Sequence, residues 1–216
     1  MLTISVAGEA LMLLPEKAAY LAERQWLLIA DAHLGKAVSF RRQGVPVPQG
    51  STADNLAALS ALIARLDVRR IVFLGDLLHS AHAHSAATQA ALAQWRDCHR
   101  DLDLTLVRGN HDDHAGDPPA ALGFEVVDEP LCVGPWALCH HPNAQADGYV
   151  LAGHLHPCVS LQGRARERLR LPCFWFGDQV GVLPAFGEFT GMHPIKALPR
   201  DRVYALTGVG VVEVPP

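Results

Sequence analysis

The sequence predicts an α/β fold, and three observations support this prediction. Residues 26–30, 71–74 and 104–107 are short, continuous apolar segments, as expected for buried strands. Residues 51–66 lie between the first two and repeat apolar side chains at helical spacing. Residues 85–100 predict a second helix before the third strand. Alternation of strand, helix and strand is typical of parallel pairing with right-handed crossovers.

The remaining segments predict further strands. Residues 2–6 and 10–14 surround Gly8-Glu9 and predict a hairpin. Residues 44–50 are rich in Pro and Gly and predict a loop, after which Ser51 or Thr52 can cap the helix. After Gly109 the sequence changes to strand-like segments separated by Gly and Pro, which indicates a second, more antiparallel sheet. These segments are 125–127, 136–139, 149–153, 158–161, 169–176 and 203–214.

Length and composition limit the possible classes of protein. With 216 residues, of which 50% are hydrophobic, the chain is expected to form a single domain over residues 1–216. The net charge of -4 gives no overall attraction to nucleic acid or to an anionic membrane. No apolar stretch has the length of a signal peptide or a membrane span, so we expect a soluble, cytoplasmic protein without membrane contact. The five cysteines form no C-x-x-C pair and are expected to be reduced and mostly buried.

Five polar motifs follow predicted strands, where α/β sheets place their chemistry. Twelve histidines are an unusual number for this length, and many of them lie in these motifs. The motifs are Asp31-Ala32-His33, Gly75-Asp76-Leu77-Leu78-His79, Gly109-Asn110-His111-Asp112, Cys139-His140-His141 and Gly153-His154-Leu155-His156. A single motif of this kind is usually a turn or a capped element. Five of them at strand ends are not explained by chance.

The residue types indicate a metal site. Oxygen and imidazole ligands suit manganese, iron or zinc, and a central carboxylate can bridge two ions. Two such ions can clamp both the attacking and the leaving oxygen of a phosphoryl transfer. In an extended segment Asp31 and His33 point to the same side, as do His154 and His156. Glycines at 75, 109 and 153 would let the backbone turn sharply and approach the ions.

Over residues 26–156 this set resembles the calcineurin-like metallophosphoesterase superfamily. The resemblance implies two β-sheets packed as a sandwich and flanked by helices, with the metals at the sheet ends. It implies that Asp31, His33 and His156 hold one ion, that Asn110, His140 and His154 hold the other, and that Asp76 bridges them. It further implies that a metal-bridging hydroxide attacks phosphorus while His111 assists over the phosphate.

Two positions differ from the common pattern of the superfamily. The fourth strand ends in two histidines. His140 is preferred as the ligand, and His141 is expected to contact either a ligand or the substrate. Many phosphatases of the superfamily carry Asp three residues after the bridging aspartate, whereas this chain carries His79, as do the superfamily's DNA-repair nucleases. His79 therefore favours a phosphodiester and is a second catalytic candidate.

A closer resemblance extends over nearly the whole chain. Residues 30–36, 40–42, 44–48, 77–80 and 183–191 are similar to the bacterial ligase-associated DNA damage response endonucleases of the PdeM family. This similarity implies a phosphodiesterase or endonuclease that works with a DNA ligase and a helicase in DNA repair. Manganese is the preferred metal, with iron or zinc as alternatives.

Several arginines are candidate phosphate contacts. Arg41 and Arg42 follow the first ligand pair closely and are predicted to bind substrate. Arg164, Arg166, Arg168 and Arg170 alternate along a predicted strand, so they form either a ridge that follows phosphates or a charged sheet edge that discourages aggregation. Residues 183–191 form a rigid apolar loop that either closes the core or walls the site.

Three functions fit the motifs. The first is a metal-dependent phosphodiesterase or endonuclease acting on DNA. The second is hydrolysis of a small nucleotide, either cyclic or a pyrophosphate, which the negative net charge favours. The third is a calcineurin-like scaffold without catalysis. His111 argues against the scaffold, because a scaffold does not need an unliganded histidine over a complete ligand set.

Overall fold

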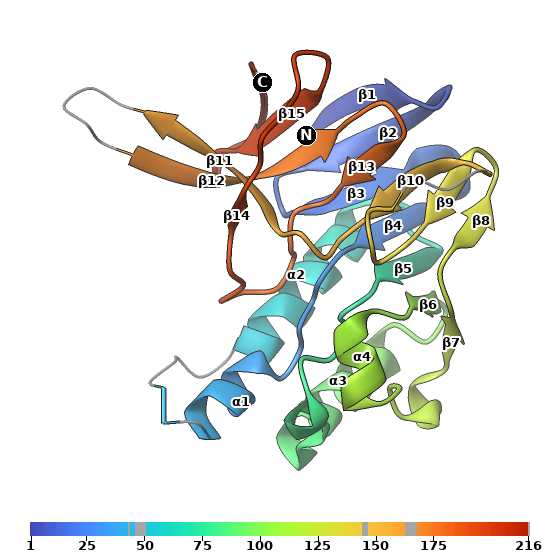
Figure 1. The fold of residues 1–216 in the computed structure, drawn as a ribbon. Coiled ribbons are helices and arrows are strands. Elements are labelled where there is room, and N and C mark those ends of the chain that lie inside the picture. Colours follow the sequence, from blue (N-terminus) through green and yellow to red (C-terminus); the bar gives the residue numbers. More distant parts are fainter. Residues whose placement is uncertain (43, 46–50, 144–146, 163–167, 216) are drawn as a thin grey trace.

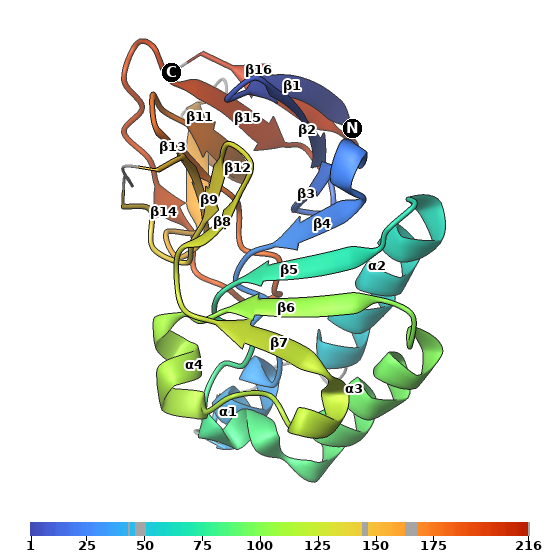
Figure 2. The ribbon, with the colours of Figure 1, turned by 90° about the vertical axis from the view of Figure 1, so that its right-hand side faces the viewer.

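The computed structural model describes residues 1–42, 44–45, 51–143, 147–162 and 168–215. Two sheets pack face to face, and the α-helices gather on the side of the first sheet (Figures 1 and 2). This arrangement confirms the expected α/β fold with two packed sheets flanked by helices. None of the described helices is long and apolar enough to cross a membrane.

The first sheet contains seven strands in the order β1-β2-β3-β4-β5-β6-β7. The first four strands pair antiparallel, whereas β4, β5, β6 and β7 pair parallel. The strands are β1 (Leu2–Val6), β2 (Glu9–Leu14), β3 (Ala18–Leu21), β4 (Trp26–Ile29), β5 (Arg70–Leu74), β6 (Asp103–Val107) and β7 (Phe124–Val127). The predicted hairpin and the predicted parallel alternation are both present. The segment at 125–127 belongs to this first sheet, not to the second as predicted.

The second sheet is mixed, with the order β14-β11-β12-β13-β10-β9-β8, and β15 pairs with β12 and β16. Five of its described strand pairs are antiparallel and three are parallel, so this sheet is more antiparallel than the first, as predicted. The segment at 203–214 is two strands, because the chain turns where the Thr207 amide donates to the Gly210 carbonyl. The strands are β8 (Leu131–Val133), β9 (Trp136–Leu138), β10 (Tyr149–Ala152), β11 (Pro157–Gln162), β12 (Arg168–Phe176), β13 (Val180–Val182), β14 (His193–Pro194), β15 (Arg202–Leu206) and β16 (Val211–Val214).

Two long helices match the predictions, and two short ones were missed. α2 (Ser51–Arg65) and α3 (Ala86–Cys98) lie within two residues of the predicted bounds, and the Ser85 side chain caps α3 by accepting from the Thr88 amide. α1 (Lys36–Arg42) and α4 (Asn110–Ala115) are one to two turns long, too short for a recognisable apolar period. Three 3₁₀ turns complete the described helices: η1 (Ala22–Arg24), η2 (Ala81–His84) and η3 (Ala120–Leu122).

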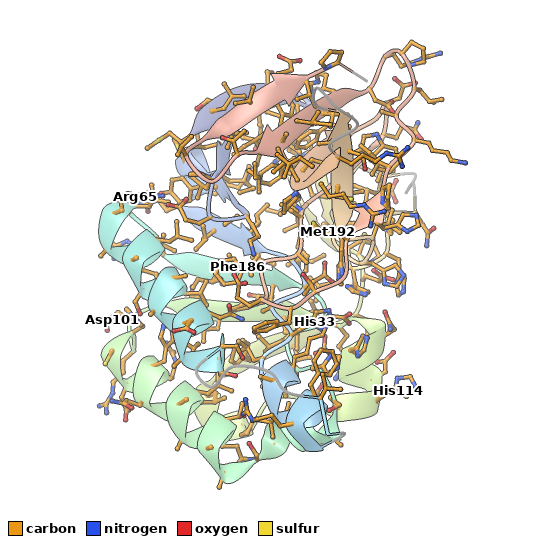
Figure 3. All side chains as sticks on the ribbon, turned by 90° about the vertical axis from the view of Figure 1, so that its left-hand side faces the viewer. His33, Arg65, Asp101, His114, Phe186 and Met192 are labelled. Atoms are coloured by element: carbon orange, nitrogen blue, oxygen red, sulfur yellow. The ribbon has the colours of Figure 1, made fainter. Side chains whose placement is uncertain are left out.

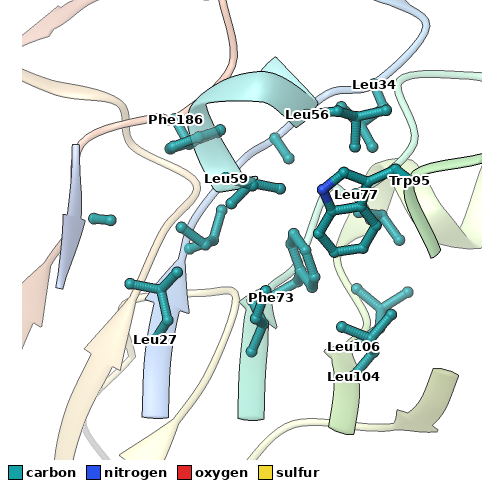
Figure 4. Close-up of a cluster of buried hydrophobic side chains, with 14 of the residues drawn as sticks. Leu27, Leu34, Leu56, Leu59, Phe73, Leu77, Trp95, Leu104, Leu106 and Phe186 are labelled. Carbon is teal, nitrogen blue, oxygen red and sulfur yellow. The ribbon is translucent and has the colours of Figure 1, made fainter. Parts of the chain in front are cut away.

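Successive residues of the central strands enter two separate cores. Leu27 and Phe73 face the helices, where they pack with Leu59 and Trp95 (Figure 4). Their neighbours on the strands, such as Val72, face the second sheet. Burial of each large apolar side chain stabilises the fold by about 1.5–3 kcal/mol. Both faces of the parallel strands are therefore covered, and their carboxyl ends are left for polar residues.

The five cysteines are all free thiols. Cys139, Cys158 and Cys173 are buried, whereas Cys98 and Cys132 are exposed. All five are unpaired and most of them are buried, as predicted, and the two exposed thiols are the exceptions.

Candidate metal centre

The predicted ligands meet at one edge of the sandwich, at the carboxyl ends of β4, β5, β6, β9 and β10. Asp31 and His140 are fully buried, and His33 and Asp76 are almost so. The loops after β4 and β5 are tied together, because the His33 amide donates to the Asp76 carbonyl over 2.8 Å. Buried carboxylates and imidazoles are costly unless a cation or a proton joins them.

The first group of donor atoms consists of Asp31, His33 and His156. The Oδ1 atom of Asp31 lies 3.6 Å from Nε2 of His156. That nitrogen is 3.4 Å from Nε2 of His33, which in turn is 3.8 Å from Oδ2 of Asp76. Burial lowers the pKa of His33, so its ring is neutral and keeps a lone pair for a metal.

The second group lies on the other side of Asp76. Nε2 of His140 is 2.9 Å from Oδ1 of Asn110, 3.0 Å from Nδ1 of His154 and 3.5 Å from Oδ1 of Asp76. The two carboxylate oxygens of Asp76 thus face different groups, as a bridging ligand requires. Burial raises the pKa of Asp76, a cost that bound cations offset. The donor set therefore fits two divalent cations.

The backbone at the ligands differs from the prediction. We expected Asp31-x-His33 and His154-x-His156 to be extended, with alternate side chains on one side. Instead all four residues have positive φ, at 51°, 43°, 69° and 48°. Non-glycine residues rarely adopt this conformation, so tertiary contacts must hold it. One such contact is the His154 amide, which donates to Oδ2 of Asp31 over 2.9 Å.

The motifs need glycine mainly because there is no room for a Cβ atom, and less because the backbone adopts a positive φ. A Cβ atom at Gly75, whose φ is +76°, would lie 2.2 Å from Nδ1 of His140. A Cβ atom at Gly153 would lie 2.6 Å from Oδ2 of Asp31. Only Gly75 of the three motif glycines has a positive φ, so the prediction of sharp turns holds there alone.

His140 and His141 have different surroundings. Nδ1 of His140 donates to the Leu74 carbonyl over 3.1 Å, so Nε2 faces the second donor group. Nδ1 of His141 is paired with Oε1 of Glu129 at 2.7 Å, and its side chain is 35% exposed. His141 also has a ring nitrogen near His140 and His154. The geometry favours His140 as the ligand and leaves His141 at the rim.

His111 lies over the centre, as the resemblance implied. Its Nδ1 donates to the His79 carbonyl over 2.8 Å, so Nε2 faces the site, 4.0 Å from Oδ2 of Asp76. The side chain is 39% exposed and can meet a substrate. The His79 ring stacks on His111 with centroids 5.1 Å apart. Burial, and to a lesser extent Lys36, lowers the pKa of His79 to about 4, so His79 is neutral at neutral pH.

The predicted substrate contacts of the arginines stay predictions, and the structure places these residues at the surface or outside its described part. Arg41 is exposed on α1 and lines a groove with Ser51 and Thr52, and no proposed ligand is among the described residues of that groove. The side chain of Arg42 lies outside the described residues, as do Arg164 and Arg166. Arg168 and Arg170 are exposed on β12.

Sequence reasoning missed two residues of the centre. Glu129 accepts hydrogen bonds from the amides of both His140 and His141, but it lies on another loop and carries no motif. Burial lowers the pKa of Lys36, and the negative charges of Asp76 and Asp31 partly offset this lowering. The position of Lys36 three residues after His33 was the available signal.

The fold and this site define a metal-dependent phosphoesterase. The chain belongs to the calcineurin-like phosphoesterase family, whose model matches residues 26–172. The whole chain is similar to the nuclease MPE of Pseudomonas putida, known from a crystal structure. The two share 44% sequence identity over 99% of each chain, with a TM-score of 0.89. No curated protein matches the chain.

Proposed function

We propose that this protein hydrolyses phosphodiester bonds in DNA with two divalent metal ions. Asp31, His33 and His156 hold one ion in this proposal. The other ion is held by Asn110, His140 and His154, and Asp76 bridges the two. The observation that carries the proposal is the placement of the Asp76 oxygens, one toward each group of imidazoles.

The ions, when bound, supply positive charge that stabilises both the attacking and the leaving oxygen. The chain itself positions His111. Because Nδ1 already donates to the His79 carbonyl, only Nε2 can exchange a proton with the substrate. A protonated Nε2 can donate to a phosphate oxygen or protonate the leaving oxygen. His79 holds His111 in place through its carbonyl and its stacked ring, which makes it a positioning residue in this proposal.

The substrate is proposed from similarity and from His79. The relative from P. putida is a nuclease, and its similarity covers the full chain. Hydrolysis of a small nucleotide is the second candidate, because the net charge of -4 disfavours a long polyanion. Manganese, a single domain over residues 1–216, a cytoplasmic location and association with a ligase and a helicase remain predictions.

A model diester tests the chemistry. The wild-type protein with added manganese should hydrolyse bis-p-nitrophenyl phosphate, and His111→Ala should lower kcat by about 100- to 10,000-fold. Asp113→Ala is the matched control, because Asp113 is exposed on the same helix and lies outside both donor groups. A folded, metal-loaded wild type without activity would refute the proposal.

The substrate class is tested separately. Single-stranded, nicked and duplex DNA should be compared with cyclic nucleotides under the same conditions. Higher kcat/KM on DNA supports a nuclease. Cleavage confined to the small nucleotides would overturn the DNA assignment while leaving the diester chemistry intact.

A further inference from the structure

A pocket lies directly beside the proposed metal centre, and the mechanism above does not use it. His156, a proposed ligand, forms one wall. The loop of residues 185–192 forms another, and Figure 3 labels Phe186 and Met192 on this loop. Pro157 and Pro172, from β11 and β12, lie on a further side. A group of the substrate that neighbours the reacting phosphate can therefore reach this pocket.

The loop is fixed to the metal centre. The Gly187 amide donates to the Asp31 carbonyl over 3.0 Å, and a Cβ atom at Gly187 would lie 2.4 Å from the Ala32 carbonyl oxygen. Phe186 is buried in the core between the first sheet and the helices (Figure 4). Nδ1 of His156 donates to the Gly191 carbonyl over 3.2 Å. The pocket wall is thus positioned by the same residues that form the ligand set.

Phe189 is exposed at the edge of this fixed loop. Its side chain is 43% exposed although its φ is +58°, a conformation that L residues rarely adopt. The Thr190 hydroxyl closes the turn by donating to the Gly187 carbonyl over 3.1 Å. Met192 in the same pocket is 42% exposed. Two large apolar side chains are therefore presented to solvent next to a metal ligand, without a contribution to the core.

The charge of the pocket selects a neutral ligand. Besides the proposed ligand His156, the residues with ionisable side chains that line it are Lys17 and Glu188, whose side chains form an ion pair at 3.3 Å. A phosphate placed here would meet the Glu188 carboxylate and a lysine that is already paired. A flat, uncharged ring is not repelled by the Glu188 carboxylate and does not need an unpaired lysine. Aromatic side chains bind bases of any sequence by stacking, because every base has a π face.

We propose that this pocket binds an unpaired nucleobase of the nucleotide next to the scissile phosphodiester, with Phe189 as the stacking surface. The proposal rests on the proposed function, since it names how that site holds its substrate. A base inside a duplex has both faces stacked, so the pocket favours single-stranded DNA or unpaired ends.

The test is a double-mutant cycle between Phe189 and one base. Single-stranded oligonucleotides carry an abasic nucleotide at each position on either side of the cleaved bond. With wild type, one position should lower kcat/KM about tenfold or more. Phe189→Ala should lower kcat/KM on the intact strand by a similar factor. With this variant, removal of the base at that position should cause no further loss of kcat/KM. Additive losses at every position would overturn the proposal.

Matched variants exclude general damage. Phe189→Trp keeps an aromatic face and should retain most of the activity, whereas Val209→Ala removes an apolar side chain that is 95% exposed and outside the pocket. Equal melting temperatures would show that each variant is folded. Equal losses in Phe189→Trp and Phe189→Ala would contradict stacking.

Binding separates failure of this proposal from failure of the proposed function. Fluorescence anisotropy with the same oligonucleotides needs no cleavage. If Phe189 and the base are coupled in binding but no DNA is cleaved, the pocket proposal stands and the proposed nuclease function is refuted. If DNA is cleaved but neither assay shows coupling, only the pocket proposal is refuted. If there is neither cleavage nor coupling, the pocket proposal and the proposed function are both refuted.

Discussion

Glu129 is predicted to set the metal affinity of the centre although it is not a ligand. Its Oε2 atom accepts from the amides of His140 and His141 at 2.7 and 2.9 Å, and Oε1 pairs with Nδ1 of His141 at 2.7 Å. Glu129→Ala removes all three contacts from the segment that carries His140. Loss of such outer partners typically weakens metal binding by about 10- to 100-fold. This corresponds to about 1.4–2.7 kcal/mol.

The assay is a manganese titration followed by phosphodiesterase activity and by the shift in Tm. Glu129→Gln is the matched control, because its amide oxygen can still accept from both backbone amides while the charge is lost. We expect Glu129→Gln to lie between wild type and Glu129→Ala. If Glu129→Ala folded normally and bound manganese as tightly as wild type, the inferred positioning of His140 would be wrong.

Three further predictions concern stability and reactivity. Phe174→Ala should lower the free energy of unfolding by about 3–5 kcal/mol in urea, because Phe174 is fully buried between the sheets. In the native protein, iodoacetamide should modify the exposed Cys98 and Cys132. The three buried thiols should react only after unfolding, and burial raises the pKa of two of them to about 12. Rapid labelling of all five cysteines would contradict this. The Arg24 hydrogen bond lowers the pKa of Glu9, so this pair stabilises the fold above the pKa of an unfolded glutamate and ceases to do so as pH falls through the lower folded pKa. Glu9→Gln should therefore lower Tm at neutral pH, which corresponds to a loss of at most about 1 kcal/mol of stability. The difference from wild type should disappear once the pH falls below the folded pKa of Glu9.

The sequence alone was enough to predict the fold class and to select the residues that meet in the two donor groups, although not Glu129 and Lys36 beside them. Continuous apolar runs identify β4, β5 and β6, because parallel strands covered on both faces need no polar alternation. Polar residues directly after such runs must meet at one sheet edge, since the carboxyl ends of parallel strands share it. This local rule brings Asp31, Asp76 and Asn110 together without knowledge of the second sheet.

Only the tertiary structure decided how these residues are held. The positive φ of Asp31 and His33 is not encoded by their own preferences, because non-glycine residues avoid it. Contacts from distant loops impose it. The choice between His140 and His141 likewise depends on Glu129 and the Leu74 carbonyl, which lie 11 and 66 residues away from His140 in the chain.

The pocket beside His156 shows the same division. The sequence identified residues 183–191 as a rigid apolar loop but left open whether it closes the core or walls the site. In the structure it does both, with Phe186 buried and Phe189 exposed three residues later. Apolar residues in one loop have no fixed period, so their directions follow from what the loop packs against. Sequence therefore specifies which side chains are available, and tertiary packing specifies which of them face the substrate.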